Sequence, residues 1–372
     1  MALGRSLFLL VALAGWAQAQ TVATDPVGAI TLTLKGNSDT FISLPFNRPV
    51  ALETTVQNVS GNTINIAGSA NLTPGQFVYA AGTQSNTYYV QFTSGARAGM
   101  YYTVTANGAS SITIDPNGDA GFSGNVSTSD GFRVIPYWTL NTLFPSGQGI
   151  NGSPSFGLGS RNTQLLFPDN STPGINRSPS SSYFYYNGTA NGGAGWRQAS
   201  ALVTTLFNDT ILYPDNFFIV RNNIAGDTSL VLVGAVPMSP LATPIATSGN
   251  NVDQDIFIGL PVPANVTLVG SNLFQSGTFT GSSSFSLPAR QDQLLVFDDT
   301  SALQNRSPST IYFYYTGSSN GGPGWRKASD LVTNIVDTAA IFVPGKGYIL
   351  RKKGTATPQT SIWTFTPSYL TP

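Results

Sequence analysis

The sequence contains no cysteine and no histidine among its 372 residues. These two absences exclude Ser-His-Asp and Cys-His catalytic sets, thiolate metal sites, iron–sulfur clusters and histidine-based zinc sites. There is no Gly-x-x-x-x-Gly-Lys-Ser/Thr phosphate loop and no Gly-x-Gly-x-x-Gly run between a strand and a helix. Without disulfides, packing and backbone pairing alone must stabilise the chain. We therefore expect no catalytic residue, no metal site and no cofactor.

Charged side chains are also scarce, at 9% of the residues, and the 17 basic ones are balanced by 17 acidic ones. Capture of nucleic acid through its phosphates needs a basic surplus, so no nucleic-acid partner is expected. Most of the surface must then consist of hydroxyl, amide and glycine groups. Such a surface suits contacts with a cell envelope, a matrix, a polysaccharide or another copy of the chain. The hydrophobic content of 41% is enough to build folded cores.

Long apolar runs are absent after the N-terminal segment. Residues 7–16 form an apolar run behind Arg5, and Ala17-Gln18-Ala19 follows it as a small-x-small cleavage signal. This run of about ten residues is far shorter than the ~20 that a membrane helix needs. Residues 1–19 are thus predicted to be a signal peptide, and the protein is predicted to be exported to the periplasm, the cell surface or the medium without a membrane span. The Pro-rich segments and the final Leu370-Thr371-Pro372 argue against an outer-membrane barrel.

A duplication organises the rest of the chain. Residues 156–204 share 28 identities in 49 ungapped positions with residues 285–333, which lie 129 residues later. The shared blocks are Asn-Arg-Ser-Pro-Ser at 176–180 and 305–309, Tyr-Phe-Tyr-Tyr at 183–186 and 312–315, and Gly-Trp-Arg at 195–197 and 324–326. The opening runs of the two copies, 41–45 and 257–261, are 216 residues apart, so the first copy holds an insert of about 87 residues. The predicted domains are a first module at 20–49 and 138–241, an inserted domain at 50–137 and a second module at 250–372.

Strand signals fill both modules and the insert. Short runs rich in Tyr, Phe, Val, Ile and Thr are separated by Gly, Pro, Asn and Ser. In the insert, alternation with a period of two predicts strands near 63–66, 76–79, 88–92, 100–105, 111–114 and 132–135. The best helical candidate is one or two turns at 198–206. The fold class is therefore predicted to be all-β, with two duplicated β-sandwich-like modules, the first interrupted by a small β-barrel-like insert.

Carboxylates are the remaining candidates for acid–base chemistry. The chain has a single glutamate, Glu53, and the adjacent Asp298 and Asp299 would point to opposite faces of a strand, which is poor geometry for a catalytic pair. Asp298 and its first-copy equivalent Asp169 are instead expected to form Asx-type turns. Residues 115–119 (Asp-Pro-Asn-Gly-Asp) match a calcium loop at three ligand positions and then depart from it, so a polar turn is expected there.

The repeated Gly-Trp-Arg block is the best candidate for ligand binding. Exposed rings would stack on sugars while the arginines supply hydrogen bonds, giving two related carbohydrate subsites. The alternative is that Tyr and Trp fill the module cores and Arg packs along them. The candidate ligand-binding residues are Trp196, Arg197, Trp325, Arg326, Tyr185 and Tyr314.

Several motifs together resemble a paralogous family of exported proteins found in Verrucomicrobia. They are Phe-Ile-x-Leu-Pro at 41–45, Tyr-Tyr-Val and Gly-x-Tyr-Tyr-x-Val in the insert, Phe-Arg-Val-Ile-Pro-Tyr-Trp-Thr-Leu at 132–140, and the Gly-Trp-Arg block. The resemblance implies export and lineage, and it assigns no functional residue. We expect a non-catalytic exported structural or surface-associated protein, with a carbohydrate-binding protein as the alternative.

Overall fold

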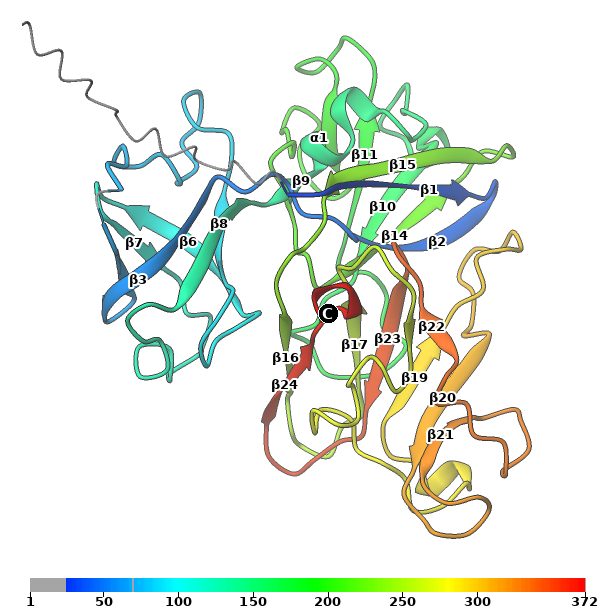
Figure 1. Cartoon of the computed structure of the whole chain (residues 1–372). Coiled ribbons are helices and arrows are strands. Elements are labelled where there is room, and N and C mark those ends of the chain that lie inside the picture. The colour runs from blue at the N-terminus through cyan, green and yellow to red at the C-terminus, as the bar shows by residue number, and fades with distance from the viewer. Residues whose placement is uncertain (1–24, 69, 372) are drawn as a thin grey trace, which may run out of the picture.

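The computed structural model describes residues 25–68 and 70–371, and the predicted signal peptide lies outside this part of the chain. The described chain is all-β, as predicted, and contains two similar modules and a closed barrel. In Figure 1 the barrel is blue to cyan, the body of the first module is green, and the second module runs from yellow-green to red. No helix within residues 25–68 and 70–371 is long and apolar enough to cross a membrane.

The first module is built on a five-stranded antiparallel sheet with the order β12-β11-β10-β14-β2. The β1–β15 pair covers one face of this sheet. Alternation along β15 turns Leu230 and Leu232 into the core and leaves Val231 and Val233 exposed, so the module is a small two-layer sandwich. Its elements are β1 (Val27–Leu34), β2 (Ser38–Ser43), β9 (Trp138–Thr139), α1 (Leu140–Leu143), the 3₁₀ turns η1 (Pro145–Gly147) and η2 (Leu158–Ser160), β10 (Thr163–Phe167), β11 (Ser181–Tyr186), β12 (Gly195–Gln198), β13 (Ile211–Leu212), β14 (Phe217–Asn222) and β15 (Thr228–Ala235).

The second module repeats this arrangement strand by strand. Its sheet has the order β21-β20-β19-β23-β17, and β16 pairs with β24 as β1 pairs with β15. The module therefore begins at β16, and the bound of 250 drawn from the sequence is too late. Its elements are β16 (Leu241–Thr247), β17 (Gln254–Gly259), β18 (Val266–Thr267), η3 (Leu287–Ala289), β19 (Gln293–Val296), β20 (Thr310–Tyr315), β21 (Gly324–Lys327), β22 (Ala340–Phe342), β23 (Gly347–Lys352), β24 (Gln359–Phe365) and η4 (Ser368–Leu370).

The insert is a closed six-stranded antiparallel barrel with the order β3-β4-β7-β6-β5-β8. Every second residue of its strands points inward, and Ile64, Ile66, Ile112 and Ile114 are among those that fill it. The barrel lies within the predicted bounds of 50–137. Its strands are β3 (Leu52–Ser60), β4 (Thr63–Ile66), β5 (Tyr88–Phe92), β6 (Tyr101–Asn107), β7 (Ser111–Ile114) and β8 (Gly131–Pro136).

Two local predictions are wrong, and β3 and α1 were not predicted. Residues 76–79 form a loop and not a strand, because Asn107 Oδ1 accepts the backbone N–H of Phe77 at 3.0 Å and replaces strand pairing there. The strand β3 was not predicted, since most of its residues are polar and Val56 alone is fully buried. Residue 198 ends β12 and residues 199–206 form turns and loops, so no helix lies there, whereas the helix α1 lies at Leu140–Leu143, where the Thr139 side chain caps it.

Candidate functional site

The Gly-Trp-Arg blocks form the edge strands β12 and β21, and both tryptophans lie in the module cores with 0% of their surface exposed. Trp196 stands opposite Tyr185 on β11, and the two rings meet edge to face with centroids 5.8 Å apart. Trp325 and Tyr314 repeat this contact at 5.6 Å. Tyr314 is also stacked on Phe274 at 3.5 Å. These rings therefore pack against protein.

Arg197 and Arg326 are each 1% exposed and donate to backbone carbonyls. Arg197 Nε donates to Val203 O at 2.8 Å, and Nη2 donates to Gly193 O at 2.7 Å. Arg326 makes the equivalent bonds in the second copy. Burial lowers the pKa of both guanidinium groups. Each arginine thus ties the glycine turn to the loop that follows its strand.

The interpretation of these blocks as sugar-stacking subsites therefore fails. Trp196 and Trp325 have no accessible ring face, Tyr185 is buried, and Arg197 and Arg326 are turned inward. The alternative drawn from the sequence, in which the aromatic rings fill the core and arginine packs along it, describes what is found. The sequence could not separate the two, because a strand pattern does not say which face meets a second layer.

The Asn-Arg-Ser-Pro-Ser blocks lie where the two modules meet. Asp39 on β2 accepts hydrogen bonds from Arg221 Nε at 2.7 Å and Nη2 at 2.8 Å. The backbone N–H of Asn305, from the second module, donates to the same carboxylate at 2.8 Å. Asn305 Oδ1 in turn accepts from Arg221 Nη2 at 2.6 Å. The second module thus completes an ion pair that belongs to the first.

The first module likewise completes an ion pair that belongs to the second module. Asp255 on β17 accepts from Arg351 Nε at 2.7 Å and Nη2 at 3.0 Å, and from the backbone N–H of Asn176 at 2.8 Å. Such an exchange of identical contacts is the pattern of an isologous dimer interface, formed here within one chain. We call the two sets together the reciprocal brace, which consists of Asp39, Arg221 and Asn305, and of Asp255, Arg351 and Asn176.

Between the two halves of the brace, the facing sheets pack through apolar side chains that include Phe41, Phe217 and Phe257. A cavity of about 440 Å³ lies there, and Leu166 and Leu295 line it as an equivalent pair. Its charged lining residues are brace residues and the arginines of the two Asn-Arg-Ser-Pro-Ser blocks, which are already bonded within the protein. This cavity therefore belongs to the module interface.

Asp169 and Asp298 form the Asx-type turns predicted for them. Asp169 Oδ1 accepts the backbone N–H of Ser171 at 2.8 Å, and Asp298 Oδ1 accepts that of Thr300 at 2.9 Å. Hydrogen bonds from Ser171 and then Thr172 lower the pKa of Asp169 to about 2. These hydrogen bonds hold Asp169 ionised, so its carboxylate is not suited to act as a general acid at neutral pH.

Residues 115–119 form the expected polar turn, in which Asp115 Oδ1 accepts the backbone N–H of Asn117 at 2.9 Å. The Asp119 carboxylate turns away to accept from Arg97 Nη2 and Tyr102 Oη, each at 2.8 Å. Asp115 and Asn117 are left facing a cavity that the sequence did not predict.

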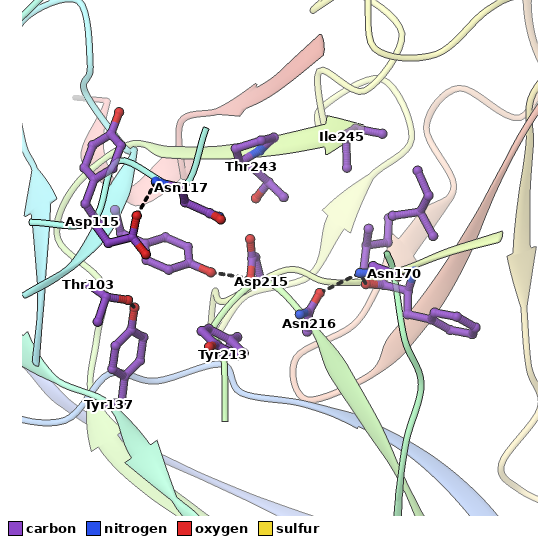
Figure 2. A pocket seen from close by; sticks show the side chains of 16 residues that line it. Thr103, Asp115, Asn117, Tyr137, Asn170, Tyr213, Asp215, Asn216, Thr243 and Ile245 are labelled. Carbon is purple, nitrogen blue, oxygen red and sulfur yellow. Dashed lines mark hydrogen bonds between the residues drawn. The ribbon is translucent and has the colours of Figure 1, made fainter. Parts of the chain in front are cut away.

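This cavity, which we call the junction cavity, has a volume of about 330 Å³ and lies where the barrel meets both modules (Figure 2). The barrel contributes β6 and the turn after β7, the first module contributes the segment before β14, and the second contributes β16 and β17. The lining residues are Tyr101, Tyr102, Thr103, Asp115, Asn117, Tyr137, Asn170, Tyr213, Asp215, Asn216, Thr243, Pro244, Ile245, Ile256, Phe257 and Ile258.

Three tyrosine rings form one wall of the junction cavity. Tyr137 meets Tyr213 edge to face at 5.6 Å and meets Tyr101 edge to face at 6.3 Å. Tyr137 Oη is held by Thr103 Oγ1 at 2.8 Å, a contact drawn in Figure 2. The Tyr213 side chain is 45% exposed, so it is the ring most open to a ligand.

Asp215 lies in the middle of the group drawn in Figure 2. Its Oδ1 accepts from Tyr101 Oη at 2.7 Å, which joins the barrel to the first module. Burial raises the pKa of Asp215, and the hydrogen bond from Tyr101 opposes this shift without cancelling it. Burial, and then the charges of Asp215 and Asp115, raise the pKa of Tyr213.

The comparisons with known proteins found no match among protein-family models, curated proteins or solved structures. The fold and the two interfaces described above are therefore the basis for any functional inference.

Proposed function

We propose that this is a non-catalytic exported protein that serves as a structural or surface-associated component. The observation that carries the proposal is the reciprocal brace, in which Asn176 and Asn305 each complete an Asp–Arg pair of the other module. Residues retained in both copies of a duplicated chain are expected to serve what both copies do. Here the retained residues hold two modules together and fill their cores, which is the work of an architectural protein.

Four of the aspartates have structural partners. Asp169 and Asp298 hold turns, and Asp39 and Asp255 hold the brace. Glycosidic cleavage needs two carboxyl groups flanking one bond, one of them able to give a proton. These four aspartates are committed to turns and ion pairs, which supports a non-catalytic role.

The proposed export and surface contacts rest on the sequence. The predicted signal peptide at residues 1–19 and the resemblance to an exported family support a role outside the cytoplasm. The balanced, sparse charge favours neutral hydroxyl and amide contacts with a cell envelope, a matrix, a polysaccharide or sibling molecules.

Cell fractionation of a bacterium that makes the whole chain tests this proposal. The expected result is a chain shortened by the signal peptide that is recovered outside the cytoplasm, adsorbs to isolated cell envelopes or self-associates in light scattering, and leaves a panel of polysaccharides intact. A chain that lacks residues 1–19 is the control and should stay in the cytoplasm. Retention of the uncleaved full-length chain inside the cell, or hydrolysis of any polysaccharide by the purified protein, would overturn the proposal.

A further inference from the structure

The junction cavity differs from the rest of the duplicated body because Tyr213 and its two aspartates, Asp115 and Asp215, have no counterpart in the second copy. Alignment of Pro214 with Pro344 places Val343 at the position of Tyr213 and Gly345 at the position of Asp215. The brace residues, in contrast, are present twice. The chemistry of the cavity is therefore not needed to build a module, and it occurs only on the side that faces the barrel.

The residues that line the cavity carry negative charge and no positive charge. Asp115 and Asp215 are the charged residues among those that line it, and neither lysine nor arginine does so. Asp215 Oδ1 accepts from Tyr101 Oη at 2.7 Å, and no lysine or arginine lines the cavity to pair with this carboxylate. A carboxylate removed from water without a cationic partner is costly, and an incoming cation would supply the missing charge. The same carboxylates would repel an anionic group.

The side chains that line the cavity with Asp115 and Asp215 indicate which kind of cation would bind there. The ring of Tyr213, which lines the cavity together with both carboxylates, suits an ammonium group through its quadrupole. The amides of Asn117 and Asn216 and the hydroxyl of Thr243 offer hydrogen bonds to hydroxyl groups. A volume of about 330 Å³ fits a small ligand unit. Amino acids fit poorly, because their carboxylate would face two aspartates.

We propose that the junction cavity binds a saccharide unit that carries an ammonium group, with Asp215 and Asp115 facing the ammonium, Tyr213 stacking on the ring, and Asn216 and Thr243 bonding hydroxyl groups. The site needs the whole chain, since the barrel and both modules each supply part of its wall. It goes beyond the structural role proposed above, and neither proposal depends on the other.

Two ligands that carry either ammonium groups or neutral acetamide groups on the same sugar backbone test the proposal. Isothermal titration calorimetry of the mature protein near pH 6.5 compares a glucosamine trimer, whose amines are protonated, with the N-acetylglucosamine trimer. We expect the amine form to bind about tenfold more tightly or better, because hydrogen bonds to a charged group are stronger than those to a neutral one. Added salt should weaken binding of the amine form alone.

Single-residue variants test ligand binding separately from folding. Asp215→Asn and Asp115→Asn should each weaken binding of the glucosamine trimer about tenfold, and Tyr213→Leu should weaken it as well, with unchanged circular dichroism. Asp253→Asn, an aspartate of the second module ion-paired with Lys353, is the matched control and should bind as the wild type does. Equal affinity for the two trimers, no binding of either, or unchanged binding by Asp215→Asn would overturn the proposal. None of these results would bear on export or envelope adsorption, so the two proposals can fail separately.

Discussion

Replacement of Asp255 by alanine should destabilise the protein far more than loss of an exposed ion pair. The Asp255 side chain is 1% exposed and accepts from Arg351 Nε, Arg351 Nη2 and the backbone N–H of Asn176. Its removal leaves a guanidinium group and a backbone donor unpaired at the module interface. Breaking a buried pair costs about 3–5 kcal/mol, and the 18% exposure of Arg351 favours the lower end, about 3 kcal/mol.

Differential scanning calorimetry measures this cost. At about 2–4 °C per kcal/mol for a large domain, the melting temperature of Asp255→Ala should fall by about 6–12 °C. The matched control is Asp253→Ala, which removes a pair with Lys353 whose aspartate is 33% exposed and which should cost about 0–1 kcal/mol. Asn176→Gly keeps the positive φ of 53° and removes the Oδ1 acceptor of Arg351, so its effect should be less than additive with that of Asp255→Ala. Equal melting temperatures for Asp255→Ala and Asp253→Ala would refute the brace as a stabilising contact.

Three further predictions concern the core, the junction cavity and the module contact. Trp325→Ala should lower the free energy of unfolding in urea by about 3–5 kcal/mol and leave the affinity for saccharides unchanged, because the ring is core; a loss of affinity in a folded variant would contradict this. The raised pKa of Asp215 means that the folded state holds its proton more tightly, so wild-type stability should fall as pH rises from the ordinary aspartate range through the raised value. The Asp215→Asn variant should not lose stability in this way when its melting temperature is measured from pH 3 to 8. Parallel melting-temperature curves for the variant and the wild type would contradict this prediction. Gly259→Ala places a Cβ 2.5 Å from Ser43 Cβ and should cost about 1–3 kcal/mol, whereas Gly159→Ala, with no atom within 4 Å, should be neutral.

The sequence allowed the architecture to be predicted because each module is a repeated pattern. Two copies of one strand-and-turn order, with Pro, Gly and Asn at the same places, indicate two copies of one fold, and the unmatched segment indicates the barrel. What escaped prediction depended on distant partners. The strand β16 was missed because its pairing with β24 spans the whole second module, and residues 76–79 were misread because the distant Asn107 bonds Phe77.

The candidate site was predicted less well for a physical reason. A Trp beside an Arg and a glycine turn looks the same on a surface as in a core, and only the second layer of the sandwich decides which it is. The junction cavity carries no motif, because Asp115, Tyr137, Asp215 and Thr243 come from segments far apart in the chain and meet only after three units have packed. The sequence signal that could have indicated the cavity is that Tyr213 and Asp215 differ from Val343 and Gly345, the equivalent residues of the second copy.

The duplication therefore separates two kinds of residue in this chain. An isologous contact requires the same residues on both sides, since Asn176 serves Asp255 only while Asn305 serves Asp39, and loss of either set leaves one module's ion pair incomplete. The barrel is inserted in one copy only, so it breaks this symmetry, and it meets the first module at the segment before β14 and the second module at β16 and β17. Residues on that side are released from the demands of the brace and can diverge, as Asp215 has from Gly345. The repeated residues account for how the body is held together, and the unrepeated ones mark where a ligand would be recognised.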